Sequence, residues 1–182
     1  DWALVSGGNL NGWRIIFEGQ QPDIALSDFS ERFNEYGLTG CLTIYKSEVN
    51  NSLFHIINGA CEDSINFVSS RGNNVSVTVD NSFADALDAD FSSLVFNQLK
   101  IANAGNDCFD VSGGKYSVES AILKNCHDKA ISVGEMSNFS GSDILIDHSN
   151  IGVSSKDSSI TIISNSVSSH VAVCAEVKRK KQ

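Results

Sequence analysis

Three aspartates, Asp88, Asp90 and Asp110, are the residues of this chain whose types and spacing best suit chemistry. Asp88 and Asp110 are separated by 22 residues, and Asp90 lies two positions after Asp88. Carboxylates that gather on one face repel one another, so they attract a cation or raise one of their pKa values. Hard cations such as calcium prefer oxygen ligands of this kind. The three aspartates are therefore a candidate calcium site, and no other cofactor is expected.

The interval of 22 residues recurs along the chain and decides whether these aspartates meet. We mark each repeat by its first strongly apolar residue, and we expect an earlier copy at residues 42–44. A sustained period in the twenties predicts a solenoid, in which each repeat buries its apolar face only by stacking on its neighbours. The repeat markers are Ile65, Leu87, Phe109, Ile131, Val153 and, after a shorter step of 20 residues, Val173.

Each repeat divides into three short segments in which apolar and polar residues alternate, as in 87–91, 94–96 and 99–101. Alternation with period two predicts β-strands with one buried face. The sequence therefore predicts an all-β fold, a right-handed parallel β-helix with about six or seven coils of ~22 residues. Strands in such a stack lie about 4.8 Å apart, so we expect Asp88 and Asp110 about 5 Å apart on the outer face.

A row of asparagines supports the same register. Asn81, Asn103 and Asn125 each precede a marker by six residues, and Asn58 precedes one by seven. Asparagine tolerates the left-handed backbone of a tight turn, and its amide can pass hydrogen bonds from coil to coil. These residues are predicted to form an asparagine ladder.

A second acidic row, Asp63, Asp85, Asp107 and Asp128, stands just before the markers. Aspartate in a turn commonly accepts a hydrogen bond from its own backbone. We therefore interpret this row as structural.

The five cysteines are expected to be free thiols. Cys41 and Cys108 share one row, three coils apart, as do Cys61 and Cys126. Three strand spacings amount to about 14 Å, beyond the Cα separation of about 7 Å that a disulfide tolerates. A pairing of Cys108 with Cys126 would join residues several positions apart along the coil, and an odd count leaves one thiol over in any case.

Composition and charge limit the partners of the chain. It has 182 residues and a formal net charge of −9. An acidic domain does not bind nucleic acid by neutralising phosphates, and no apolar segment approaches the roughly 20 residues that span a membrane. Most phenylalanines fall at inward positions, so no aromatic platform for sugar stacking is evident.

The chain is predicted to form one domain with three parts. Residues 1–40 are expected to be an N-terminal cap with an irregular first coil, in which residues 22–36 form a short helix or a long loop. The β-helix itself is expected over 41–177, followed by a basic tail at 178–182. Because the chain opens on Asp1, we expect a mature or trimmed product and a secreted or cell-surface location.

Several blocks of the sequence resemble a known group of proteins. They include EDSINFVSS (62–70), FADALDADFSS (83–93), GNDCFDVSGG (105–114) and DKAISVGEMS (128–137). Over about residues 38–178 the chain resembles right-handed parallel β-helix repeat proteins of the pectin-lyase-like superfamily, which are mostly bacterial and secreted or surface-linked. The resemblance implies a fold more than an activity, because the superfamily includes lyases, hydrolases, epimerases and adhesins.

For catalysis, the resemblance implies calcium-binding acids on the strand that carries Asp88, Asp90 and Asp110. A lyase also needs a basic residue that removes a proton, and only Arg71 and Lys156 lie near, both off register. An inverting hydrolase needs two carboxyl groups about 6.5–9.5 Å apart, which Asp90 and Asp110 alone would satisfy. The weak candidates for catalytic residues are therefore Asp88, Asp90, Asp110 and Lys156.

Three functions follow from these observations. The first, which we favour, is a non-catalytic β-helix module that binds carbohydrate or serves as a surface scaffold, as part of a larger secreted protein. The second is a calcium-dependent polysaccharide lyase or epimerase that acts on an acidic polysaccharide. The third is a structural protein that assembles end to end as a homo-oligomer.

Overall fold

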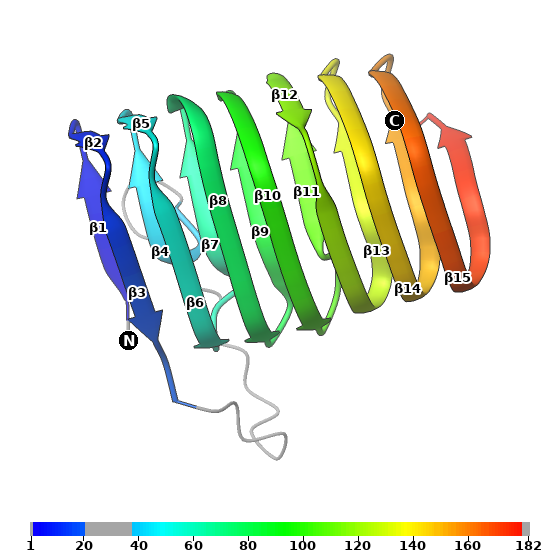
Figure 1. The fold of residues 1–182 in the computed structure, drawn as a ribbon, viewed down its shortest axis with the longest axis horizontal. Helices are drawn as coiled ribbons and strands as arrows, with labels where there is room; N and C mark the ends of the chain where they lie inside the picture. The colour runs from blue at the N-terminus through cyan, green and yellow to red at the C-terminus, as the bar shows by residue number, and fades with distance from the viewer. Residues whose placement is uncertain (1, 21–37, 180–182) are drawn as a thin grey trace.

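The computed structural model describes residues 2–20 and 38–179, and this part of the chain is a parallel β-helix of about six turns without an α-helix (Figure 1). The repeat length of ~22 residues matches the right-handed β-helix that the sequence predicts. No helix in the described ranges has the length and hydropathy that crossing a bilayer requires.

The coil is built from strands that pair in parallel with the equivalent strand one turn away. This arrangement leaves every first strand of a coil in one sheet, as Figure 1 shows for β1, β4, β7, β9 and β11. The strands are β1 (Ala3–Ser6), β2 (Asn9–Asn11), β3 (Arg14–Glu18), β4 (Gly40–Tyr45), β5 (Glu48–Asn50), β6 (Leu53–Gly59), β7 (Asp63–Val68), β8 (Arg71–Ser82), β9 (Asp85–Asp90), β10 (Ser93–Ala104), β11 (Phe109–Ser112), β12 (Lys115–Val118), β13 (Ala121–Gly134), β14 (Asn138–Lys156) and β15 (Ile160–Lys178).

The predicted repeat markers stack in register, with one exception. Ile65 pairs with Leu87, Leu87 with Phe109, and Phe109 with Ile131. Ile131 pairs in turn with Val153, and the earlier copy joins the stack through Leu42. The marker Val173 is wrong: Val153 pairs with Ala175, and Val173 pairs with Ile151. Because β14 and β15 match without an inserted or deleted residue, the step of 22 residues continues to the last coil.

Phenylalanine rings fill the centre of the solenoid. Phe54, Phe67, Phe96, Phe109 and Phe139 form a continuous series of edge-to-face contacts, with ring centroids 5.3, 6.1, 5.5 and 6.1 Å apart. Such pairs contribute about 0.5–1.5 kcal/mol beyond the burial of their area. The core therefore extends along the axis and links each coil to the next.

The four asparagines of the predicted row are hydrogen-bonded from coil to coil. Asn81 Nδ2 donates to Asn58 Oδ1 at 3.1 Å, Asn103 to Asn81 at 2.9 Å, and Asn125 to Asn103 at 2.8 Å. All four residues have a positive φ, between 54° and 64°. The row therefore combines a left-handed turn with an amide that satisfies its neighbour.

The expectation of free thiols is wrong for four of the five cysteines. Disulfides join Cys41 to Cys61 and Cys108 to Cys126, with Cα atoms 5.4 and 5.3 Å apart, and only Cys174 is free. Each pair is separated by slightly less than one repeat, 20 or 18 residues. The end of a coil therefore returns beside its own beginning, where the turn brings two cysteines of different rows together.

The N-terminal residues extend the solenoid. The strands β1, β2 and β3 pair in parallel with β4, β5 and β6, so residues 3–18 make up a three-stranded first coil. The helix or loop predicted for residues 22–36 lies outside the described residues, as does the end of the basic tail at 180–182.

Candidate functional site

The predicted aspartates lie on the outer side of the first sheet. Asp110 on β11 pairs with Asp88 on β9, and Ser112 pairs with Asp90. The same register continues the row of Asp88 in both directions, so that acids, amides and hydroxyls alternate along it. We call this set the polar row: Asn66, Asp88, Asp110, Ser132, Ser154 and Glu176.

The polar row is much more buried than its outward direction suggests. Asn66 is 1% exposed and Ser132 and Ser154 are 0% exposed, while Asp88 and Asp110 are half-buried. Burial, and next the charge of Asp63, raise the pKa of Asp88 well above its ordinary value. Burial also raises the pKa of Asp110 to about 6, although the charge of Lys156 opposes this. The carboxyl groups therefore hold protons more tightly than solvated aspartates do.

Asn66 links the two acidic rows. Its Nδ2 donates to Asp63 Oδ2 at 3.1 Å and to Asp88 Oδ2 at 2.9 Å. Three buried atoms of the polar row have no hydrogen-bond partner in the structure: Asn66 Oδ1, Asp110 Oδ1 and Ser132 Oγ. Ser132 Oγ does lie beside the Asp110 carboxyl and lowers its pKa, but the two groups fall short of hydrogen-bond geometry. A cation bound here would contact Asp88, Asp90 and Asp110, at the cost of displacing their protons.

Lys156 and Arg71, the two basic candidates, differ in their position. Val133 pairs with Ser155, so Lys156 follows the register of Gly134, beyond the row of Asp110. A Cβ atom at Gly134 would lie 3.6 Å from Lys156 Cε, which means that the lysine stem crosses the glycine. Arg71 lies at the start of β8, where its Nη2 contacts Glu48 Oε2 at 3.0 Å. The structure therefore brings Lys156 towards Asp110 and leaves Arg71 on a different sheet.

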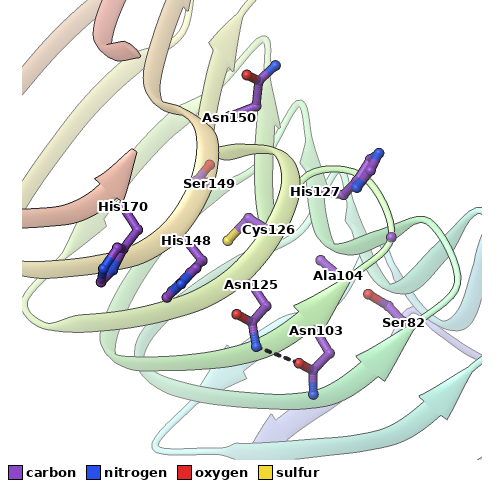
Figure 2. A pocket seen from close by; sticks show the side chains of 11 residues that line it. Ser82, Asn103, Ala104, Asn125, Cys126, His127, His148, Ser149, Asn150 and His170 are labelled. Carbon is purple, nitrogen blue, oxygen red and sulfur yellow. Dashed lines mark hydrogen bonds between the residues drawn. The ribbon is translucent and has the colours of Figure 1, made fainter. Parts of the chain in front are cut away.

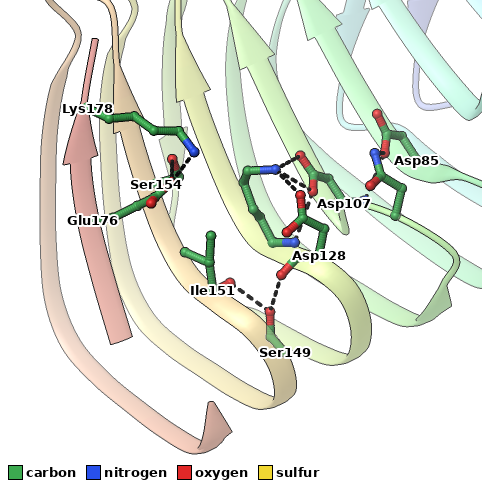
Figure 3. Close-up of polar contacts among 10 residues, drawn as sticks. Asp85, Asp107, Asp128, Ser149, Ile151, Ser154, Glu176 and Lys178 are labelled. Carbon is green, nitrogen blue, oxygen red and sulfur yellow. Dashed lines mark hydrogen bonds and ion pairs between the residues drawn. The ribbon is translucent and has the colours of Figure 1, made fainter. Parts of the chain in front are cut away.

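The second acidic row bonds to the next coil rather than to its own turn. The backbone N–H of Asp107 donates to Asp85 Oδ1 at 2.8 Å, and that of Lys129 donates to Asp107 Oδ1 at 2.9 Å (Figure 3). Lys129 Nζ also contacts the carboxylates of Asp107 and Asp128. Lys129, one position after the predicted Asp128, is thus the residue in this register, and the row is structural, as the sequence predicts.

A surface groove that the sequence did not predict follows the turns between the first and second strands. We call it the Phe91 groove; its volume is about 670 Å³. Phe91 is 63% exposed, because it occupies a turn with a φ of 48°. A Cβ atom at Gly113 would come within 2.6 Å of Phe91 Cδ1, so the ring rests on this glycine. The groove is lined by Gly7, Gly8, Asn9, Lys46, Ser47, Glu48, Ser69, Ser70, Arg71, Phe91, Ser92, Ser93, Gly114 and Lys115.

The sequence did contain a signal for this groove. Lys46, Ser69, Phe91 and Gly113 recur at steps of 23, 22 and 22 residues, and all have a positive φ. A left-handed residue turns its side chain away from the strand alternation. Gly113 marks such a turn, and the register then moves Phe91 from the core to the surface.

Comparison of the chain with protein-family models, with curated proteins and with solved structures gave no match.

Proposed function

We propose that this protein is a non-catalytic β-helix module that binds an acidic carbohydrate along the Phe91 groove. The observation that carries the proposal is the exposed Phe91 ring, which Gly113 supports from below. An aromatic ring offers a rigid apolar face at a low cost in conformational entropy. The apolar C–H faces of a sugar ring suit such a surface.

The charges of the groove favour an acidic ligand. Lys46, Arg71 and Lys115 line it, and Glu48 is the one acidic residue among the lining residues. Glu48 is already paired with Arg71 at 3.0 Å. The groove is therefore cationic on a chain whose formal net charge is −9. Local positive charge attracts carboxylate or sulfate groups and raises the rate at which they meet the protein.

The shape of the groove favours a linear polymer. Its lining residues come from successive coils, from Gly7 in the first to Lys115, and so it runs along the solenoid axis. Each coil adds a strand spacing of about 4.8 Å, with backbone and hydroxyl groups at each step. A chain of sugar units can contact several coils at once, which is the usual advantage of an extended repeat surface.

The location and ancestry that we propose are a secreted or cell-surface protein of pectin-lyase-like type. The two disulfides support an oxidising compartment, since such bonds are rare in the cytosol. The parallel coils with their hydrogen-bonded asparagines support the relationship to the superfamily.

A direct binding experiment tests the proposal. Calorimetry with polygalacturonate and alginate should give measurable binding, whereas neutral dextran should give none. Phe91→Ala should weaken binding to the acidic polymers about tenfold, by loss of one stacking face. Trp13→Ala is the matched control, because Trp13 is also exposed (53%) but does not line the groove. Equal affinity for dextran, or equal losses in the two variants, would contradict the proposal.

The alternative of a calcium-dependent lyase or epimerase has one observation in its favour, the approach of Lys156 to Asp110. Against it, Asp88, Asp90 and Asp110 line none of the four main cavities of the described structure. Incubation with uronans in the presence of calcium, followed by the absorbance of unsaturated products, distinguishes the two functions. Turnover that Asp110→Asn abolishes would establish the lyase instead.

A third candidate, end-to-end assembly, is favoured by the last coil. In the described residues β15 pairs only with β14, and its surface exposes Ile160, Ile162, Val167 and Val177. An apolar strand edge of this length is a template for pairing with another chain. Sedimentation over a range of concentrations tests this candidate, and a monomer at every concentration would exclude it.

A further inference from the structure

Two histidines continue the row of asparagines. His148 and His170 follow Asn125 at steps of 23 and 22 residues, and their φ values of 60° and 53° match those of the asparagines. Histidine is among the residues that adopt this backbone conformation most readily. The repeat therefore holds two imidazoles one coil apart, with ring centroids 4.2 Å apart and an interplanar angle of 20°.

A single carboxylate joins these two rings. His148 Nδ1 lies 3.0 Å from Asp147 Oδ1, and His170 Nδ1 lies 2.8 Å from the same oxygen. Ser169 Oγ also donates to Asp147 Oδ1 at 2.8 Å. One carboxylate oxygen has about two lone pairs, so three donors exceed its capacity. The two imidazoles and the carboxylate are thus gathered more closely than hydrogen bonding alone requires.

The spacing of these atoms suits one metal ion. Ligand oxygen and imidazole nitrogen lie about 2.0–2.1 Å from a divalent transition metal, so edges of 2.8 and 3.0 Å correspond to ligand–metal–ligand angles of about 90°. The three ligand atoms lie within 4.8 Å of one another. A small opening of the exposed side chains would also reach a tetrahedral arrangement. Each neutral imidazole can coordinate through Nδ1 and keep its proton on Nε2.

We propose that Asp147, His148 and His170 bind a divalent transition metal ion of the class that imidazole and carboxylate hold, such as Zn²⁺, Ni²⁺ or Cu²⁺. The site borders a hollow of about 590 Å³ that Asn103, Asn125 and His127 also line (Figure 2). The side chains of His148 and His170 are 57% and 66% exposed, which leaves the remaining coordination positions open to water. This site is separate from the Phe91 groove, with which it shares no lining residue.

The repeat itself supplies conservative variants for the test. His148→Asn and His170→Asn place in the row the residue that its other members have, so the turn should remain folded. His127→Asn is the matched control, because His127 lines the same hollow but lies apart from the stacked pair in Figure 2. Circular dichroism of each variant checks that the strands are retained.

Calorimetric titration of the untagged full chain with Zn²⁺, and separately with Ni²⁺, tests the proposal. We expect one ion per chain, with affinity that falls about tenfold or more in His148→Asn and in His170→Asn. His127→Asn should bind as the parent chain does. No binding of either ion, unchanged affinity in both variants of the stacked pair, or an equal loss in His127→Asn would overturn the proposal.

Discussion

Phe91 rests on Gly113: a Cβ atom at this glycine would come within 2.6 Å of Phe91 Cδ1. The two residues occupy the same turn in adjacent coils, and both have a positive φ. The glycine therefore serves the turn and also leaves the space that the aromatic ring needs. This contact holds the ring in the position that our proposal assigns to the carbohydrate.

Gly113→Ala should weaken binding of acidic polysaccharide more than it weakens the fold. The new methyl group displaces the ring, and the positive φ of 62° adds about 1–2 kcal/mol of backbone strain. Gly12→Ala is the control, since Gly12 has a φ of 74° but nothing within 4 Å of its Cβ position. Both variants should lose similar stability in thermal unfolding, and only Gly113→Ala should lose affinity. Equal affinities would contradict the role of the contact.

Removal of the second disulfide should destabilise the solenoid. Cys108→Ala with Cys126→Ala opens a link across 18 residues, which constrains the unfolded chain by about 3 kcal/mol. Urea unfolding of the double variant measures the loss. Cys174→Ala, which removes the exposed free thiol, should leave the midpoint unchanged. A double variant as stable as the parent would show that the bond contributes nothing.

Stability should decrease as pH rises from about 4 to about 7. Burial raises the pKa of Asp63 to about 7 and that of Asp110 to about 6, so the folded state binds protons more tightly than the unfolded state. The contribution of both groups is complete below the pKa of an unfolded aspartate and is lost as pH rises through the folded pKa.

Unfolding in urea at several pH values measures this dependence. Asp63→Asn and Asp110→Asn remove the buried ionisation and should each flatten the curve over the same range. A stability that increases with pH over this range would contradict the assigned burial.

Phe96→Ala should cost far more stability than Phe91→Ala. Phe96 is fully buried between Phe67 and Phe109, with ring centroids at 6.1 and 5.5 Å. Truncation of such a residue costs about 3–5 kcal/mol through lost burial and the cavity that remains. Phe91 is exposed, so its truncation should change the unfolding free energy by under about 1 kcal/mol. Similar losses in chemical denaturation would contradict the placement of one of the rings.

The sequence predicted those features that depend only on the repeat. Because parallel strands keep their register, a step of 22 residues was enough to place Asp88 over Asp110 and Leu87 over Phe109. The same rule shows why Val173 was misassigned: both Val171 and Val173 fit the alternation, and only the exact step separates them from Ala175.

Features that depend on the turns were not predictable in this way. The pairing of Cys108 with Cys126 joins the two ends of one coil across a turn, so a comparison of rows misses it. The burial of Asp88 depends on neighbours from other coils rather than on its own strand. The histidines at 148 and 170 were missed because the residue type changes within a row whose backbone conformation does not.

An amide chemical-shift titration with an oligogalacturonate tests the central claim most directly. The proposal predicts shifts that concentrate at residues 46–48, 69–71, 91–93 and 114–115, and that disappear in Phe91→Ala. Shifts centred instead on Asp88, Asp90 and Asp110, or no shifts at ligand saturation of a folded sample, would contradict it.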